Sequence, residues 1–336
     1  MPRIRLQDVA KHAGVSMKTV SNVVHAHPHV SPAMREKVQL AIDELGYRPN
    51  ALGRRLATGR SGLVALALPD GRIPYFAELA NAVTTAAAAR GYRVLLEQTR
   101  GSLDEERAIV SSSEAGLVDG VIMQPSAMSV VELAQHQDDV PVVLLGEGAA
   151  PLTMDHLMVD NVAAATAVTA HLADAGRRRI AFLGHEAAGP SATSRQQLIG
   201  YQAGLERSGR RLDTGLLVAV DSISARSAAE AMGAALDAGL DLDAVVCRDD
   251  LAAIGALRAL QERGVDVPGD VQVTGWDDIE MAALTSPSLT SVSADMGALA
   301  EGALEMLAER LDGFEGLGRH RLVGWELRVR ESAPGA

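Results

Sequence analysis

Two pairs of neighbouring carboxylates are the part of this sequence that most resembles an acid–base site. Asp249-Asp250 and Asp277-Asp278 each stand at the end of an apolar segment. Adjacent carboxylates can share a proton, so that one acts as an acid while the other acts as a base. An aspartate in this position can instead cap the next helix by accepting hydrogen bonds from its first amide groups. We favour capping for both pairs, because no catalytic constellation accompanies them elsewhere in the sequence.

Other residues that could carry chemistry lack the partners that the chemistry needs. His25, His27 and His29 alternate in a polar loop, but no cysteine or carboxylate lies nearby at metal-ligand spacing. Ser111–Ser113 falls within a predicted helix and lacks the glycines of a nucleophile elbow. Cys247 is the only cysteine, and we expect it to be a small buried residue of a strand. No glycine-rich phosphate loop follows the first predicted strand, so we expect no catalytic residue, no metal and no cofactor.

Lys18 and Asn22 point to a different chemistry, the recognition of nucleic-acid bases. They lie one turn apart in a predicted helix and therefore share a face. Met17 and Thr19 stand at the start of the same helix, which is the end that meets base edges in DNA-reading helices. These contacts require a module that presents this helix to DNA.

The stretch from Gln7 to Val24 predicts two short helices joined by a tight turn. Gly14 occupies the corner, where positive φ is needed, and Ser16 can cap the second helix. Each helix has an apolar stripe, and the two stripes consist of Val9, Ala10, Ala13, Val20, Val23 and Val24. This pattern is typical of a helix-turn-helix, whose second helix enters the major groove of DNA. An ordinary helical hairpin is the alternative.

A third helix and a linker complete the N-terminal part. Ser31 and Pro32 predict the start of a helix, and Gly46 predicts its end. A short helix over 51–57 follows, and it contains Gly53, which costs about 1 kcal/mol relative to alanine. The segment is either a flexible linker or a hinge that folds only on DNA beside a partner chain. We expect Gly53→Ala to tighten operator binding if the segment is a hinge.

The charge of the chain is unevenly distributed. Residues 1–60 contain ten Lys or Arg and four Asp or Glu, a net charge of +6, whereas the whole chain of 336 residues carries −12. The remainder therefore carries −18. A basic module on an acidic protein fits nucleic-acid contact at one end and is not typical of a uniformly acidic soluble enzyme. The length and the 47% hydrophobic content predict two or three domains with substantial cores.

From residue 61 onward the sequence predicts alternating strands and helices. Buried strands are expected at 62–68, 92–98, 119–125 and 140–146, with helices at 76–90, 103–116 and near Val130. The pattern begins again after Asp160-Asn161, with strands at 178–184, 215–220, 244–247 and 271–276 and helices through His171 and at 195–208, 227–238 and 251–263. Repeated β-α-β units predict parallel sheets. Two such halves in tandem predict two lobes with a ligand cleft beyond the carboxyl ends of the strands.

Longer motifs give the chain a family resemblance over about residues 3–332. They include DVAKHAGVSMKTVSNVV, VSPAMREKV and LGYRPNALGRRLATGRSG near the N-terminus, and IPYFAELANAV and VQVTGWDD later. With these motifs the chain resembles the lactose/galactose-repressor family. The resemblance implies an all-α helix-turn-helix headpiece at 1–48, a hinge at 49–60 and an α/β core like that of periplasmic binding proteins at 61–336. The core would have two doubly wound parallel sheets, in an N-lobe of about 61–160 and 293–322 and a C-lobe of about 161–292 and 323–332.

The resemblance also implies partners and DNA contacts. Members of the family dimerise through the core and bind a pseudo-palindromic double-stranded operator. The chain lacks the heptad extension that makes some members tetramers, so we expect a homodimer. Lysine can donate to guanine and asparagine can pair with adenine, which suits residues that read bases. The implied DNA-binding residues are Met17, Lys18 and Asn22 at bases, Thr19, Ser21, His29 and Asn50 at phosphates, and Arg54 and Leu56 in the hinge, where Leu56 would wedge into the minor groove.

The cleft of the family binds a small-molecule effector, and here the chain departs from its relatives. Gln197 stands where sugar-responsive members have arginine, and Gly146 stands where an aspartate is usual. Arg248-Asp249 replaces the frequent Asn-Asp, whereas Asp277 matches an effector-contacting aspartate. The implied effector-binding residues are Tyr75, Phe76, Glu147, Arg195, Gln197, Arg248, Asp249, Trp276 and Asp277.

Arg248 leaves the nature of the effector open. Arginine suits planar acceptors such as carboxylate or phosphate, so the effector could be anionic. Arg248 could instead pair with Asp249, Asp277 or Glu147 and close the cleft with a salt bridge. A neutral sugar, or no effector at all, is also compatible with the sequence. Trp276 could stack on a sugar face or belong to the core.

These observations predict an allosteric transcription regulator, which we expect to be a repressor and not an enzyme. A periplasmic-type solute-binding protein is the alternative, but the basic headpiece and the missing signal-peptide segment argue against it. No apolar run approaches the roughly 20 residues of a membrane helix. We therefore expect a cytoplasmic protein without membrane contact.

Overall fold

The computed structural model describes residues 4–24, 29–47, 60–110, 117–135, 140–187, 189 and 191–335. The chain divides into two units, Met1–Ser61 and Gly62–Ala336, which are described one at a time. Within the described ranges, no helix is both long enough and apolar enough to cross a membrane.

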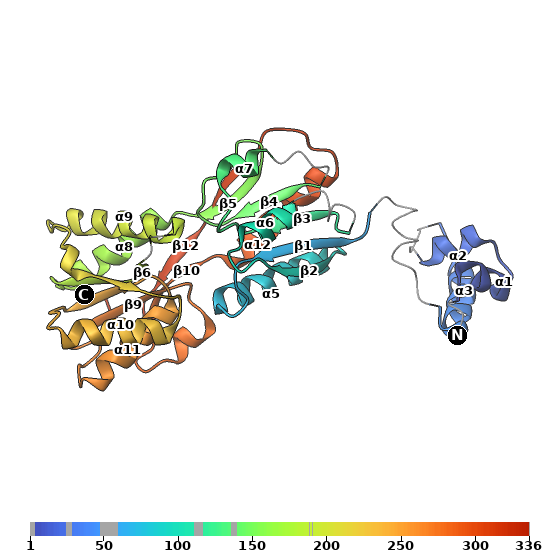
Figure 1. Ribbon diagram of the computed structural model, residues 1–336. Helices are drawn as coiled ribbons and strands as arrows, with labels where there is room; N and C mark the ends of the chain where they lie inside the picture. The colour runs from blue at the N-terminus through green and yellow to red at the C-terminus, as the bar shows by residue number, and fades with distance from the viewer. Residues whose placement is uncertain are drawn as a thin grey trace. The chain divides into compact units, whose positions relative to one another are not determined.

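The first unit is a three-helix headpiece made of α1 (Leu6–Ala13), α2 (Met17–Val24) and α3 (Pro32–Leu45) (Figure 1). Gly14 ends α1 in the left-handed conformation, with φ of 60°. This backbone turn lets the amide of Val15 bond to the carbonyl of Ala10, and the chain then enters α2. The predicted apolar stripes meet in one core, formed by Val9, Ala10, Ala13, Val20, Val23, Val38, Ala41 and Tyr47.

The ends of α3 confirm the predicted caps. The side chain of Ser31 accepts a hydrogen bond from the amide of Met34, and Pro32 occupies the first helical position. Gly46 ends the helix in the left-handed conformation. Because these caps use residues within the helix and its neighbours, they can be recognised from local sequence alone.

The first lobe of the second unit has a sheet in the order β11-β5-β4-β3-β1-β2. All of its strand pairs are parallel. Helices α5 and α12 pack on one face, and α6 and α7 on the other. The elements are β1 (Leu63–Leu68), α5 (Pro74–Ala89), β2 (Arg93–Gln98), α6 (Leu103–Val110), β3 (Gly120–Met123), α7 (Val130–Ala134), β4 (Val142–Leu145), β5 (Asp155–Val159), α12 (Met296–Leu311) and β11 (His320–Val323).

The second lobe has a sheet in the order β12-β10-β9-β8-β6-β7, which is parallel except for the β10–β12 pair. Helices α8 and α9 cover one face and α10 and α11 the other (Figure 1). The elements are α8 (Asn161–Asp174), β6 (Ile180–Glu186), α9 (Ala192–Arg207), η1 (Thr214–Leu216), β7 (Leu217–Val220), α10 (Ala225–Asp237), β8 (Ala244–Cys247), α11 (Asp250–Glu262), β9 (Gln272–Trp276), η2 (Glu280–Leu284), β10 (Thr290–Ala294) and β12 (Trp325–Arg328).

The two lobes are interleaved and do not follow one another in tandem. The chain passes from one sheet to the other between β5 and α8, between β10 and α12, and between β11 and β12. The expectation of tandem halves, drawn from the strand–helix pattern alone, is therefore wrong in its connections. The predicted strands and helices are present within a few residues of their expected bounds, except that residues 111–116, including Ser111–Ser113, lie outside the described residues.

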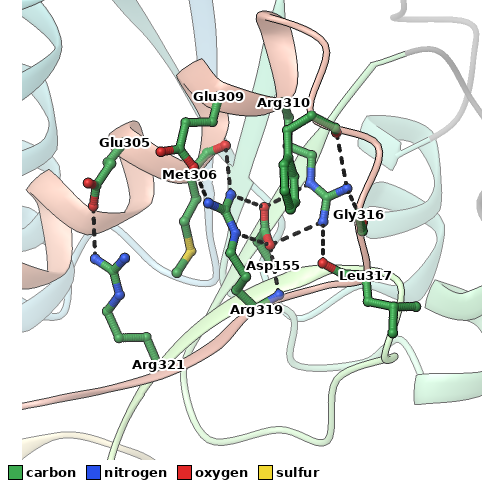
Figure 2. Close-up of polar contacts among 10 residues, drawn as sticks. Asp155, Glu305, Met306, Glu309, Arg310, Gly316, Leu317, Arg319 and Arg321 are labelled. Carbon is green, nitrogen blue, oxygen red and sulfur yellow. Dashed lines mark hydrogen bonds and ion pairs between the residues drawn. The ribbon is translucent and has the colours of Figure 1, made fainter.

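A buried ion-pair cluster fixes the edge of the first sheet, where β11 joins β5. The carboxylate of Asp155, which is fully buried, accepts hydrogen bonds from Arg310 and Arg319, with a distance of 2.9 Å to Nε of Arg310 and to Nη2 of Arg319 (Figure 2). Both guanidinium groups also stack on the ring of Phe314, at 4.7 and 4.6 Å from its centroid. Burial alone would raise the pKa of Asp155, but the bonds from the two arginines outweigh it and lower that pKa.

Candidate DNA-binding surface and inter-lobe cavity

Helix α2 has one buried face and one face that carries the predicted DNA contacts. The side chain of Ser16 accepts a hydrogen bond from the amide of Thr19 at 3.1 Å, which confirms the predicted cap. Val20 and Val23 are buried in the headpiece core. Met17 is 54% exposed, and Lys18 is exposed beside it at the N-terminal end of the helix. The start of α2 is therefore available to a ligand of the headpiece.

The structure places six of the nine predicted DNA-binding residues. Met17, Lys18 and His29 are exposed, while Thr19, Ser21 and Asn22 are half-buried. Five of them belong to α2, and His29 lies in the segment before α3. The other predicted contacts, Asn50, Arg54 and Leu56, lie outside the described residues, as do Gly53, His25 and His27.

A cavity of about 580 Å³ lies between the two sheets of the core. Its walls come from segments that follow the carboxyl ends of the strands, such as Gln124 after β3, Glu147 after β4 and Arg248 after β8. Parallel strands bring such segments to one edge of each sheet, which is where ligands bind in open α/β folds. All nine residues that the sequence predicted at the effector site line this cavity: Tyr75, Phe76, Glu147, Arg195, Gln197, Arg248, Asp249, Trp276 and Asp277.

Aromatic side chains form part of the wall on both lobes. Tyr75 and Phe76 lie in the first turn of α5 with their rings edge to face, 5.2 Å between centroids. Burial, and then the charges of Glu147 and Asp277, raise the pKa of Tyr75 well above its usual value, so its hydroxyl keeps its proton. Trp276 packs in the core of the second lobe, which confirms one of its two predicted roles, and it also lines the cavity.

A loop on the first lobe is held in place by a buried carboxylate, Glu106 of α6. Its oxygens accept hydrogen bonds from the amides of Ser126, Ala127 and Met128, at distances between 2.7 and 3.1 Å, and from the hydroxyl of Ser126. The side chains of Ser126 and Met128 line the cavity. Glu106 therefore fixes the shape of this wall without contacting the cavity.

Hydrogen bonds cross from one lobe to the other beside the cavity. Thr193 of α9 donates to the carboxylate of Glu147 at 2.8 Å, and Gln196 donates to the Glu147 carbonyl at 3.0 Å. A further bond between the lobes runs from the amide of Glu280 to the carboxylate of Glu78 in α5, at 3.0 Å. The relative position of the lobes is thus coupled to residues that border the cavity.

Arg248 forms an ion-pair cluster on the second lobe. Its guanidinium lies 3.5 Å from a carboxylate oxygen of Glu186 and 3.3 Å from one of Asp249. Its backbone passes close to Gly184, where a Cβ atom would lie 2.9 Å from the Cβ of Arg248. Gly184 sits at an irregularity in the pairing of β6 with β7, just before Glu186. Of the pairings left open by the sequence, that with Asp249 is present, and the second partner is Glu186 and not Asp277 or Glu147. Because both partners belong to the second lobe, this cluster does not close the cleft between the lobes.

In the first carboxylate pair, the capping prediction is confirmed for Asp249 but not for Asp250. Asp249 caps α11 by accepting a hydrogen bond from the amide of Ala252 at 2.7 Å. Asp250 is buried and accepts from the hydroxyl of Ser291 at 2.6 Å and from the amide of Ile279 at 2.8 Å. Burial raises the pKa of Asp249, and it raises that of Asp250 to about 7. Both groups therefore have structural partners that explain them without catalysis.

The second pair contradicts the capping prediction. Asp277 and Asp278 have φ angles of 94° and 54°, so the chain makes a left-handed turn after β9. The following helix, η2, is capped at Ile279 without a side-chain hydrogen bond. Asp278 instead pairs with Arg330 at 2.6 Å and Arg328 at 3.1 Å. Non-glycine residues rarely adopt such φ angles, and they concentrate at binding sites.

Four buried polar atoms around the cavity have no hydrogen-bond partner among the described residues. They are the side-chain oxygens of Gln124 and Gln197, the amide nitrogen of Asn161 and Nε of Arg248. Buried polar groups are normally paired, because burying them alone costs about 1–3 kcal/mol each. Two of these atoms accept hydrogen bonds and two donate, so they would suit a ligand that does both.

Sequence reasoning missed Glu106, Gln124, Asn161 and Glu186. The last three stand at or just beyond the carboxyl end of a strand, namely β3, β5 and β6. A search for polar residues at every strand end would have found them. Glu106 lies in the first turns of α6 among other acidic residues, and no sequence signal separates it from its exposed neighbours.

Two family models match the chain. The model described as bacterial regulatory proteins, lacI family, matches residues 5–50, and the periplasmic binding protein-like domain matches residues 169–333. The HTH-type transcriptional regulator CelR of Thermobifida fusca is 32% identical over 350 residues, covering 98% of this chain and 98% of that protein.

Solved structures agree with this relation. A structure of the lac repressor dimer bound to operator and the anti-inducer ONPF has a TM-score of 0.87, at 26% identity over 99% of this chain and 100% of that chain. A CelR–cellobiose complex has a TM-score of 0.72, at 30% identity over 98% of this chain and 100% of that chain. The headpiece, the interleaved lobes and the cavity are thus those of a DNA-binding transcription regulator and not of an enzyme. The chain belongs to the lacI family of bacterial regulatory proteins.

Proposed function

We propose that this regulator binds a pseudo-palindromic operator as a homodimer in the cytoplasm and represses transcription from it. In this proposal Met17, Lys18 and Asn22 read bases, Thr19, Ser21, His29 and Asn50 contact phosphates, and Arg54 and Leu56 act in a hinge at 49–60. The exposure of Met17 and Lys18 at the start of α2 supports the first of these roles, because a residue that reads bases must be accessible to DNA. Phosphate contacts would fix the register of the headpiece, while base contacts would specify the sequence.

The second part of the proposal is a hydroxyl-bearing effector, a sugar or sugar derivative, between the lobes. The observation that carries it is the cavity, whose walls come from both lobes and contain unpartnered donors and acceptors. Sugars present hydroxyls that donate and accept, as well as apolar ring faces that suit Tyr75 and Trp276. The CelR–cellobiose complex gives a precedent for a sugar bound to a relative.

The proposed mechanism is a two-state change in the relative position of the lobes. An effector that contacts both walls changes the free energy of the Glu147–Thr193 and Glu78–Glu280 contacts between the lobes. Such a change can alter how the N-lobes of a dimer present their hinges and headpieces. The effector must bind the two states with different affinity, and couplings of about 1–3 kcal/mol are typical.

Selection of DNA sites from a random pool tests the regulator role. The purified full-length protein is incubated with the pool at a stated salt concentration, because phosphate contacts make affinity depend on salt. Enrichment of a pseudo-palindrome is the expected result, and it should be lost in Asn22→Ala at the corresponding base. A pool that shows no enrichment, with or without a mixture of mono- and disaccharides, would contradict the proposal.

A further inference from the structure

The charge around Arg248 bears on which ligands the cavity can accept. Among the described residues that line the cavity, Arg195 and Arg248 are basic, whereas Glu147, Glu186, Asp249 and Asp277 are acidic. Arg248 is only 12% exposed, and both ends of its guanidinium face carboxylates. Its cationic head is therefore already neutralised by the protein.

Glu186 is held in the position that neutralises Arg248. Its carboxylate accepts a hydrogen bond from the amide of Ser191 at 3.2 Å, at the start of the 16-residue helix α9. Burial alone would raise the pKa of Glu186, but the charge of Arg248 and bonds from Ser194 and Ser191 lower it overall. Asp249 differs, because burial raises its pKa. Glu186 is thus a carboxylate beside Arg248 whose charged form is stabilised by the residues around it.

We propose that Glu186 determines the charge selectivity of the cavity, so that it accepts an uncharged hydroxyl-bearing ligand and rejects its carboxylate or phosphate analogues. The inference rests on the proposed role of the cavity as the effector site. An anion that approached Arg248 would have to displace Glu186, and it would also face Glu147. The unpartnered Nε of Arg248 still offers one hydrogen bond, which a hydroxyl oxygen can accept without carrying charge.

The variant Glu186→Gln tests this inference, because it keeps the shape of the side chain and removes only its charge. The probes are D-glucose, D-glucuronate, which differs by one carboxylate, and inorganic phosphate. Affinities are measured by calorimetry on the full chain at constant ionic strength, with circular dichroism as a check that the variant is folded. We expect Glu186→Gln to bind glucuronate or phosphate about tenfold to a hundredfold more tightly than the wild type, since a hydrogen bond to a charged group is worth that much.

Three variants locate the effect. Glu262→Gln removes the carboxylate of an exposed Arg258–Glu262 pair, 2.7 Å long, and should leave anion binding unchanged. Asp249→Asn, which can still cap α11, should give a smaller gain than Glu186→Gln. Adding Arg248→Met to Glu186→Gln should abolish the gain, because the released cation is gone. Anion binding that persists in this double variant would come from a site that does not involve Arg248.

Two results would overturn the inference. One is equal anion affinity in the wild type and in Glu186→Gln, and the other is a wild type that binds glucuronate more tightly than glucose. The proposed function is tested separately, by operator binding of the wild-type protein with and without neutral sugars. A gain of anion affinity in Glu186→Gln with no sugar effect on operator binding would support the charge selectivity and refute the effector role.

Discussion

The core contains two clusters of arginine and carboxylate side chains that differ in completeness. Around Asp155, two arginines approach a fully buried carboxylate to 2.9 Å (Figure 2). The ring of Phe314 packs against both guanidinium groups. Around Arg248, the distances to Glu186 and Asp249 are 3.5 and 3.3 Å, and Nε has no partner among the described residues. The first cluster is internally satisfied, whereas the second borders a cavity.

The difference separates a structural role from a binding role. The Asp155 cluster joins the end of α12 and the start of β11 to β5, so its contacts hold the folded chain together and leave none of its described groups for a ligand to bind. The Arg248 cluster keeps donors and acceptors available at the cavity wall, at a cost in stability that a ligand can offset. Matched substitutions in the two clusters should therefore affect different properties.

The largest expected effect is on stability, in Asp155→Asn. The substitution removes the buried carboxylate that Arg310 and Arg319 share, and only Arg319 keeps another carboxylate partner, Glu309; breaking a buried ion pair typically costs about 3–5 kcal/mol. Glu186→Gln is the matched change beside the cavity, and we expect it to cost about 1 kcal/mol or less, because water reaches its 23% exposed side chain. Denaturant unfolding of both variants measures the difference. Equal losses would contradict the comparison.

The pH dependence of stability should have opposite signs at Asp155 and at Asp250, the buried carboxyl group that adjoins the Arg248 cluster in sequence. The lowered pKa of Asp155 stabilises the fold above its unfolded pKa near 4, and this contribution disappears as the pH falls through the lower folded value. Asp250, next to Asp249, has its pKa raised to about 7. The fold therefore loses stability through this group as the pH rises from about 4 to 7. The slope is at most roughly 1.4 kcal/mol per pH unit.

Variants assign each part of this pH dependence. Asp250→Asn should flatten the fall in the free energy of unfolding between pH 4 and pH 7, and Asp155→Asn should leave that range unchanged. Chemical denaturation at several pH values gives the slopes. The assignment to Asp250 fails if wild type and Asp250→Asn have the same slope.

A smaller effect is expected at Glu106, which is satisfied like Asp155 but supports the cavity wall. Glu106→Gln places an amide donor against the amides of residues 126–128, and we expect a loss of about 1–3 kcal/mol in stability. Ligand affinity should also fall, while operator affinity without ligand stays unchanged, because only the loop is disturbed. Glu105→Gln, an exposed change one residue earlier, is the control and should change neither property.

The parts of the fold that could be predicted are those specified locally. Gly14, Ser31 and Gly46 each mark a helix boundary through backbone geometry or a cap within a few residues. Strand β5 was missed because it begins with Asp155 and His156, two polar residues that are buried. The arginines that make this burial possible lie more than 150 residues further along the chain. Helix α12, in contrast, has a local signal, since its buried Leu299, Ala303 and Leu307 recur at helical spacing.

In the candidate site, too, the residues that line the cavity could be predicted, whereas the partners of their side chains could not. The nine residues that the family resemblance implied all line the cavity, at the ends of strands or in segments and helices that follow them. The partnership of Arg248 with Glu186 depends on the irregularity at Gly184, and the left-handed turn at Asp277 and Asp278 depends on contacts with Arg330. Neither has a local sequence signal, because each depends on a residue from a distant segment.

The most direct test of the account is the affinity for a selected operator, measured with and without a neutral sugar that stabilises the protein against thermal unfolding. If the cavity is an effector site, such a sugar should change the dissociation constant by about fivefold or more, in either direction. A sugar that stabilises the protein but leaves operator affinity unchanged would contradict the account, because binding in the cavity would then not be coupled to the headpiece.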